Sequence, residues 1–142
     1  MLSRKQKHPI FVIHKHRATH LHYDLRLEMK GALKSWAVPK EPSTEEGVRR
    51  LAIRVEDHPL EYADFEGVIP GGAYGAGTVE IWDRGHYVPV KMGSHEILVE
   101  LKGKKLKGVY CLIKLKSGLA QEKNWLFFKK KQSTGKLSGK IQ

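Results

Sequence analysis

Hydrophobic and polar residues alternate over short stretches of this chain. Val, Ile, Leu, Tyr and Trp take every second position, and Gly, Pro, Asp and Ser separate one stretch from the next. A period of two is that of a β-strand with one buried face, whereas a helix repeats every 3.6 residues. The pattern predicts eight strands, at residues 10–14, 20–29, 33–38, 51–56, 77–82, 97–101, 107–115 and 124–130.

Little helix is expected between these strands. Only the run from Ser43 to Glu46 resembles a helix start, and Gly47 would end that helix within one turn. The glycine-rich stretch 67–77 predicts the longest loop. About eight mainly antiparallel strands predict an all-β fold, a small closed or nearly closed β-barrel, because closure removes the exposed edges of a sheet.

Composition adds the domain organisation and the class of partner. The length of 142 residues suits one domain, with a basic N-terminal extension at 1–9, a barrel at 10–131 and a flexible basic tail at 132–142. The formal net charge of +11 favours nucleic acid as partner, although an anionic membrane or a merely solvated surface would also account for it. Cys111 is expected to be a buried hydrophobe. With no signal core and no apolar span, we expect a cytoplasmic location and no membrane partner.

The segment 20–29 places all its ionisable groups on one face, because successive side chains of a strand point to opposite faces. One face is apolar and carries Leu21, Tyr23, Leu25, Leu27 and Met29. The other carries His20, His22, Asp24, Arg26 and Glu28. An ordinary solvated strand face favours Lys, Thr and Glu, so this composition points instead to metal or phosphate chemistry.

His22 and Asp24 stand two residues apart on that face, at roughly 7 Å, so both can reach one ion. His16 is the preferred third ligand, which gives a two-histidine, one-carboxylate set that suits Mn²⁺, with Fe²⁺, Co²⁺ and Zn²⁺ as alternatives. Arg26 on the same face can grip phosphate oxygens through its planar fork. Metal and arginine together predict a phosphoryl site.

A second polar cluster lies at 54–62. Alternation predicts Leu51, Ile53 and Val55 on the core face of this strand, with Arg50, Arg54 and Glu56 on the other face. His58, held before Pro59 at the strand end, can act as an acid or a hydrogen-bond donor, and Tyr62 can donate from the turn that follows. Taken alone, the segment would be an ordinary turn.

Several separated motifs occur in one order along the chain. They are FVIHKH at 11–16, LHYDLRLE at 21–28, LKSWAVPK at 33–40, VEDHPL at 55–60, YADFEGVIP at 62–70, YGAGTV at 74–79 and WDRG at 82–85. Together they resemble the 3′-phosphoesterase domain of bacterial DNA ligase D. The resemblance implies a β-barrel with its active site on the surface. It also implies Mn²⁺-dependent removal of a 3′-terminal ribonucleoside and of the remaining 3′-phosphate, which yields 3′-hydroxyl ends for repair by end joining.

Matched position by position, the resemblance also implies the roles of individual residues. The metal ligands correspond to His16, His22 and Asp24. Residues that contact phosphate or lie around the site correspond to Arg26, His58, Tyr62, Glu56 and Arg50. His14 stands where the family usually has glutamine, and it would add a ligand, retune the site or substitute as a hydrogen-bonding group.

The resemblance implies DNA primer-templates or RNA-containing 3′ ends as substrates. Residues 1–9 are shorter than the family's N-terminal arm, so phosphate removal is better supported than ribonucleoside removal. The chain looks like a freestanding version that depends on a separately encoded ligase and polymerase. Two rival hypotheses stay open: a non-catalytic barrel that binds single-stranded nucleic acid, and an Fe²⁺ oxygenase with the same ligand set.

Overall fold

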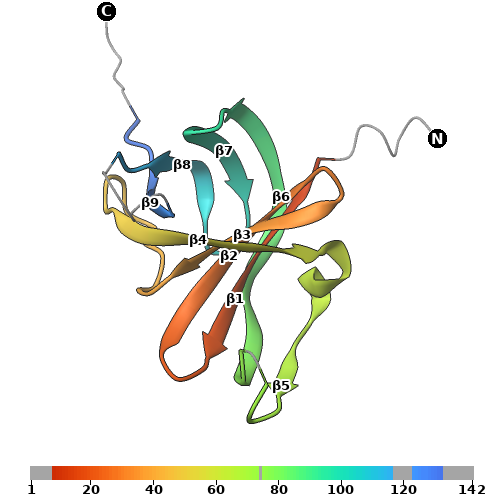
Figure 1. The fold of residues 1–142 in the computed structure, drawn as a ribbon. Coiled ribbons are helices and arrows are strands. Elements are labelled where there is room, and N and C mark those ends of the chain that lie inside the picture. Colours follow the sequence, from red (N-terminus) through yellow and green to blue (C-terminus); the bar gives the residue numbers. More distant parts are fainter. Residues whose placement is uncertain (1–7, 74, 117–122, 133–142) are drawn as a thin grey trace, which may run out of the picture.

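The computed structural model describes residues 8–73, 75–116 and 123–132. Within them the chain forms nine β-strands and one short 3₁₀ helix, η1 (Figure 1). The strands are β1 (Ile10–Arg17), β2 (Leu21–Met29), β3 (Ala32–Val38), β4 (Arg50–Pro59), β5 (Gly67–Ile69), β6 (Gly77–Met92), β7 (Glu96–Lys102), β8 (Lys107–Lys114) and β9 (Asn124–Lys129), and η1 spans Leu60–Asp64. The prediction of an all-β protein is confirmed.

Eight of the strands close into an antiparallel barrel. They follow the order β1-β2-β3-β4-β9-β8-β7-β6, and β6 pairs again with β1. The long strand β6 makes closure possible, because residues 78–86 pair with β1 and residues 86–92 pair with β7. The short strand β5 pairs with the start of β6, outside the closed ring. The predicted barrel is therefore confirmed, with one strand added outside it.

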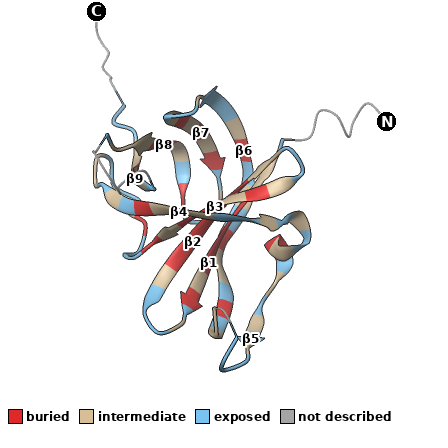
Figure 2. Ribbon diagram, in the orientation of Figure 1, coloured by how far each residue is buried: buried red, intermediate tan, exposed pale blue. Residues whose placement is uncertain are grey.

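The alternation in the sequence explains the core of the barrel. Inward-facing residues such as Leu25 in β2 and Trp36 in β3 are fully buried, together with Tyr87 in β6 and Leu112 in β8. In Figure 2 the buried segments lie along the strands where they cross the centre of the barrel. Closure buries these side chains without a second sheet, because the inward face of each strand packs against the inward faces of all the others.

A second, smaller layer covers part of the outer face of the sheet. After β4 the chain turns through η1 and descends to β5, beside the outer face of β1, β2 and β3 (Figure 1). Val12 and Leu33 on the outer face are fully buried, and they pack with Ala63 of η1. This layer shelters outward-facing residues that would otherwise be exposed to solvent.

The structure corrects several expectations about individual elements. β6 extends ten residues beyond the predicted strand end, and the predicted loop 67–77 contains β5. No helix forms at 43–46 in the described chain, where the Ser43 hydroxyl accepts a hydrogen bond from the Glu45 backbone (3.0 Å). The helical turn forms instead at η1, which follows Pro59 and ends before the extended backbone of Phe65.

The faces of β4 are the reverse of those predicted. Ala52 is fully buried in the barrel core, whereas Leu51 is 39% exposed, and Ile53 and Val55 lie on the outer side. Arg54 pairs with Trp36 and stacks against its ring on the inner side, at one end of the barrel. Alternation alone does not show which face of β4 is buried, because the small Ala52 is the core residue and the larger Leu51 is not.

Cys111 is buried, as expected. In the described part of the chain, no helix has the length and apolar character needed to cross a membrane. The predicted extension at 1–9 and the predicted tail at 132–142 fall almost entirely outside the described residues.

Candidate metal and phosphate site

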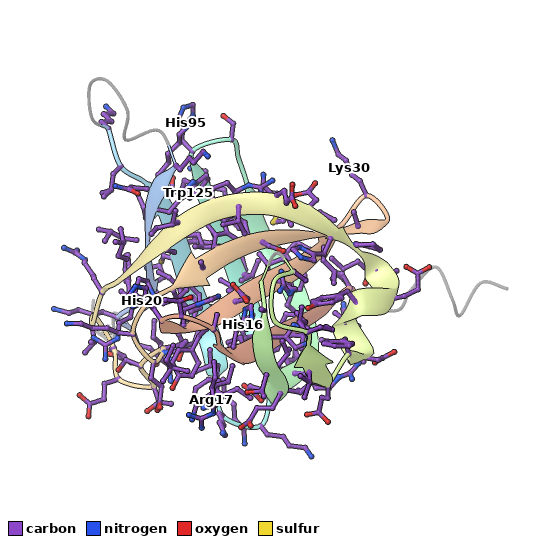
Figure 3. The ribbon with its side chains drawn as sticks, turned by 60° about the horizontal axis from the view of Figure 1, so that its bottom comes forward. His16, Arg17, His20, Lys30, His95 and Trp125 are labelled. Carbon is purple, nitrogen blue, oxygen red and sulfur yellow. The ribbon has the colours of Figure 1, made fainter. Side chains whose placement is uncertain are left out.

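Two neighbouring strands bring three ligand-type side chains together on the outer face of the barrel. His16 in β1 lies opposite His22 in β2, and Asp24 follows two residues later on the same face. Nδ1 of His16 and Nε2 of His22 lie 3.4 and 3.3 Å from Oδ2 of Asp24. One ligand atom from each residue lies within 4.8 Å of the others. In Figure 3, His16 lies at the centre of the view, close to β5.

Backbone carbonyls fix which nitrogen of each histidine faces this group. His16 Nε2 lies 2.7 Å from the Gly75 carbonyl, and His22 Nδ1 lies 3.1 Å from the His20 carbonyl. A carbonyl only accepts, so these nitrogens carry the protons and the opposite nitrogens turn their lone pairs toward Asp24. Three acceptors then face one another, an arrangement that a shared proton or cation makes favourable.

The charge state of the group favours an ion at this position. Burial alone would raise the pKa of Asp24, but its hydrogen bonds with His16 and His22, which form when these rings share a proton with the carboxylate, and the charge of Arg26 hold that pKa well below its usual range. The hydrogen bond with Asp24 raises the pKa of His22, against the opposing effect of burial. Asp24 is therefore an anion at neutral pH, with imidazole nitrogens beside it.

Arg26 is buried at one side of this group and is bound on nearly every edge. Its Nη2 lies 3.4 Å from Asp24 Oδ2, and its Nε donates to Nδ1 of His14 at 3.0 Å. Its Nη1 donates to the Ser35 hydroxyl at 2.9 Å and lies 3.1 Å from Nδ1 of His58. These contacts hold the guanidinium in one orientation despite its burial.

His14 supports the arginine from behind. It is fully buried, and its Nδ1 accepts from Arg26, so the proton lies on Nε2. Burial, and then the charge of Arg26, lower the pKa of His14 to about 4. The imidazole is therefore neutral at physiological pH, as an acceptor from arginine must be.

His58 and Tyr62 form the opposite wall. Their rings lie 4.9 Å apart, and the Tyr62 ring also lies 5.0 Å from the guanidinium carbon of Arg26. Burial, followed by the charge of Arg26, lowers the pKa of His58. His58 Nδ1 lies 3.1 Å from Nη1 of Arg26 and 3.2 Å from the Glu56 carbonyl. In the tautomer in which Nδ1 accepts from Arg26, the neutral His58 carries its proton on Nε2, where it can donate to a ligand.

The triad, Arg26, His58 and Tyr62 line one cavity of about 330 Å³. The residues predicted for the site that line it are His16, His22, Asp24, Arg26, His58, Tyr62 and Glu56. His14 lies behind Arg26 and does not line the cavity. Arg50 is absent from the lining too, and its Nε donates to the Glu41 carbonyl at 2.7 Å.

Two contributors were not predicted from the sequence. Ser35 is fully buried on β3, where it binds Arg26 and donates to the Leu33 carbonyl at 3.1 Å. Gly75 contributes a backbone carbonyl from the loop before β6. The alternation Leu33, Ser35, Ala37 could have shown that Ser35 shares a face with Arg26, whereas no sequence pattern marks a carbonyl.

Comparison with known proteins assigns the family. The family model described as the DNA Ligase D 3′-phosphoesterase domain matches residues 14–114, which include all three ligand-type side chains. The chain belongs to this family. The resemblance found in the sequence motifs is thereby confirmed.

Similar proteins include much longer members of the same family. The chain is 51% identical over 109 residues to the multifunctional non-homologous end joining protein LigD of Pseudomonas aeruginosa, covering 73% of this chain and 13% of that protein. It is 52% identical over 108 residues to LigD of Mycobacterium tuberculosis, covering 73% and 14%. For LigD of Mycolicibacterium smegmatis the values are 49% over 127 residues, 82% and 16%. The chain thus spans well under a fifth of the length of these relatives.

Proposed function

We propose that this 3′-phosphoesterase domain is a metal-dependent hydrolase that removes the phosphate from nucleic-acid 3′ ends and leaves a 3′-hydroxyl. The observation that carries the proposal is the convergence of three acceptor atoms beside the bound guanidinium of Arg26 in one cavity. Family membership and the names of the end-joining relatives support DNA ends as the substrate. The same site would also remove a 3′-terminal ribonucleoside. Ligase and polymerase activities would then act on the 3′-hydroxyl product.

The residues of the triad fit a divalent cation. His16 and His22 present neutral imidazole nitrogens and Asp24 presents a carboxylate oxygen, at a spacing that suits ligands about 2 Å from a shared ion. This mixed nitrogen and oxygen donor set suits Mn²⁺, with Co²⁺ and Zn²⁺ as alternatives. When bound, such an ion would polarise a phosphate oxygen and lower the pKa of water.

The surrounding residues would bind and orient the phosphate. Nη2 is the edge of Arg26 that faces Asp24, while Nε and Nη1 are engaged by the protein, so phosphate would meet the Nη2 edge. His58 would donate from Nε2 to the phosphate or to the leaving oxygen, and Tyr62 would add a second donor. Glu56 at the rim would orient water, while His14 would act through Arg26. Arg50 would contact the nucleic acid outside the cavity.

End analysis of a 5′-labelled primer-template tests this proposal. One primer ends in a 3′-phosphate and a second in a single ribonucleotide, and each is incubated with EDTA or with a series of Mn²⁺, Co²⁺ and Zn²⁺ concentrations. We expect a 3′-hydroxyl product only with metal. Failure to release phosphate at any metal concentration would favour the non-catalytic single-strand-binding barrel.

The variant Asp24→Asn shows whether the measured activity comes from this site or from a contaminating enzyme. Loss of the carboxylate charge should weaken metal binding and reduce turnover at least about a hundredfold. Asp64→Asn is the matched control, since Asp64 is an exposed carboxylate that pairs with Arg84 outside the cavity. Normal turnover by Asp24→Asn would exclude this group as the reaction centre.

A further inference from the structure

The cavity continues into a second groove across β4. Val55 and Glu56 line both the cavity and an adjoining groove, which is completed by Arg54, Asp57 and Lys123. β9 pairs with β4 from Arg50 to Ile53, and the Arg54 backbone N–H then donates to the Lys123 carbonyl at 2.8 Å. Beyond Arg54, no strand among the described residues pairs with this edge of β4. A flexible chain that leaves the cavity can pass over it.

Positive charge gathers where the groove reaches the end of the barrel. Lys34 of β3 and Arg54 of β4 both lie over the Trp36 ring, at 5.8 and 5.4 Å from its centroid. Burial, and then the charges of Arg54, Lys30 and Lys114, lower the pKa of Lys34, so these cations lie close enough to repel one another. Lys123, exposed in the adjoining groove, adds a fifth cation.

Among the described residues, ion pairs neutralise only part of this cluster. Asp57 is the carboxylate recorded near Lys34, and it already pairs with Arg54 at 2.7 Å. None of the ion pairs recorded among the described residues includes Lys34, Lys114 or Lys123. Asp57 and Glu56 line the groove beside Arg54 and Lys123, so the excess of positive charge lies on the lysines that have no ion pair. Like charges held close together destabilise the fold, and an anionic ligand would relieve their repulsion.

The position of the cluster suits a nucleic-acid strand whose 3′ end occupies the cavity. Arg54 and His58 belong to one strand and pair with β3 residues three positions apart, so they are separated by roughly 10 Å, at about 3.3 Å per residue. This distance corresponds to a few phosphates of a nucleic-acid chain, at about 3.4 Å of rise each in a duplex. A single free phosphate could not span it, so the arrangement fits a polymer.

We propose that the strand leading to the reactive 3′ end crosses the free edge of β4 and that Lys34, Lys114 and Lys123 bind its phosphodiester backbone. The proposal rests on the proposed function, because it assumes that the 3′ end lies in the cavity. The contacts are to phosphate and not to bases, so they set affinity and register without selecting a sequence. This surface would make the enzyme prefer polymeric ends over mononucleotides.

The test compares two variants of equal charge. K34Q/K114Q/K123Q neutralises the cluster, whereas K102Q/K104Q/K107Q removes three exposed lysines from the opposite ends of β7 and β8. Binding of a fluorescent primer-template is measured by anisotropy in EDTA over a series of salt concentrations. We expect the cluster variant to lose at least about tenfold in affinity. The slope of log affinity against log salt concentration should become less steep by about two, because each lost phosphate contact removes about 0.7–0.9 from it. The control should change little.

Two further measurements make the outcome decisive. Removal of 3′-phosphate from a dinucleotide should be unchanged in the cluster variant, while kcat/KM on a long primer should fall. Equal losses of affinity in both variants, or none in the cluster variant, would overturn the proposal.

If the triple variant unfolds, K114Q/K123Q, which leaves Lys34 over Trp36, carries the same test. A wild-type protein that hydrolyses nothing would refute the proposed function, yet the binding comparison would still decide whether the strand follows this path.

Discussion

At the scale of single residues, the central feature is a buried arginine with almost all of its donors assigned. Arg26 is only 3% exposed, and a buried charge is costly unless its donors are satisfied. His14, Ser35 and His58 satisfy two of its nitrogens, which leaves the edge beside Asp24 for a ligand. The arginine therefore acts as a fixed electrostatic element and not as a mobile clamp.

Ser35→Ala tests whether this fixation matters. The change removes one of the two partners of Nη1 without altering charge, and a hydrogen bond to a charged group contributes about 1.5–3 kcal/mol. We expect turnover of a 3′-phosphate to fall about ten- to hundredfold while Mn²⁺ affinity, measured by calorimetry, stays unchanged. Ser35→Thr retains the hydroxyl and should recover most of the rate. An equal loss of turnover in Ser35→Ala and Ser35→Thr would show that the shape of the side chain matters, and not its hydrogen bond to Arg26.

At the scale of elements, irregularities in the strands decide which side chains reach the site. Between Ser35 and Leu33 the partner residues on β4 step from Val55 to His58, so β4 contains one extra residue. This bulge brings His58 to the outer face, where regular alternation would place Asp57. A similar shift lies at Ile13/His14 in the pairing of β1 with β6.

The sequence predicted the site best where the strands are regular. His22 and Asp24 follow from alternation within one strand. His16 lies beyond the predicted strand 10–14, but β1 extends to Arg17 and pairs with β2 without a bulge, which brings His16 opposite His22. The face of β4 could not be predicted, since Leu51 and Ile53 look like core residues although the small Ala52 fills that role. The shelter of the site by η1 and β5 is a tertiary effect, and no local pattern reports it.

Gly75→Ala tests the loop that orients a ligand. Gly75 has a φ of +77°, a conformation that alanine resists, and its carbonyl receives the proton of His16. Moving this carbonyl should weaken Mn²⁺ binding about 10- to 100-fold, as measured by calorimetry. Gly71→Ala is the matched control, because its Cβ would enter open space and its φ is unrestrictive. Similar affinities in the two variants would show that the carbonyl does not orient the ligand.

At the scale of the whole molecule, the closed barrel provides a rigid support for a site on its exterior. The site uses one outer face, so its polar residues do not compete with the apolar residues that fill the interior. Two buried tyrosines link separate elements of the barrel. The Tyr87 hydroxyl donates to the Glu28 carbonyl (2.7 Å), and the Tyr110 hydroxyl donates to the Ser43 carbonyl (2.8 Å). These bonds join β6 to β2 and β8 to the segment before β4.

The same hydroxyls make stability sensitive to alkaline pH. Burial raises the pKa of Tyr87 from 10.0 to about 12, so the folded state retains a proton that the unfolded chain releases near pH 10. The protonated Tyr87 hydroxyl therefore contributes its full stabilisation to the folded state below pH 10, and this stabilisation is lost as the pH rises toward 12. The free energy of unfolding should therefore exceed that of Tyr87→Phe by about 1–2 kcal/mol at pH 8, and this difference should shrink between pH 10 and 12.

Denaturant unfolding of both proteins at a series of pH values checks this expectation. Lysines also titrate in this range, but they are the same in both proteins, so their effect cancels in the difference. Val99→Ala provides a control in which a buried apolar side chain is shortened without removing a titrating group. Its difference from wild type should stay constant with pH. A constant difference for Tyr87→Phe as well would mean that the ionised hydroxyl is tolerated in the folded barrel, and that the bond between β6 and β2 does not limit alkaline stability.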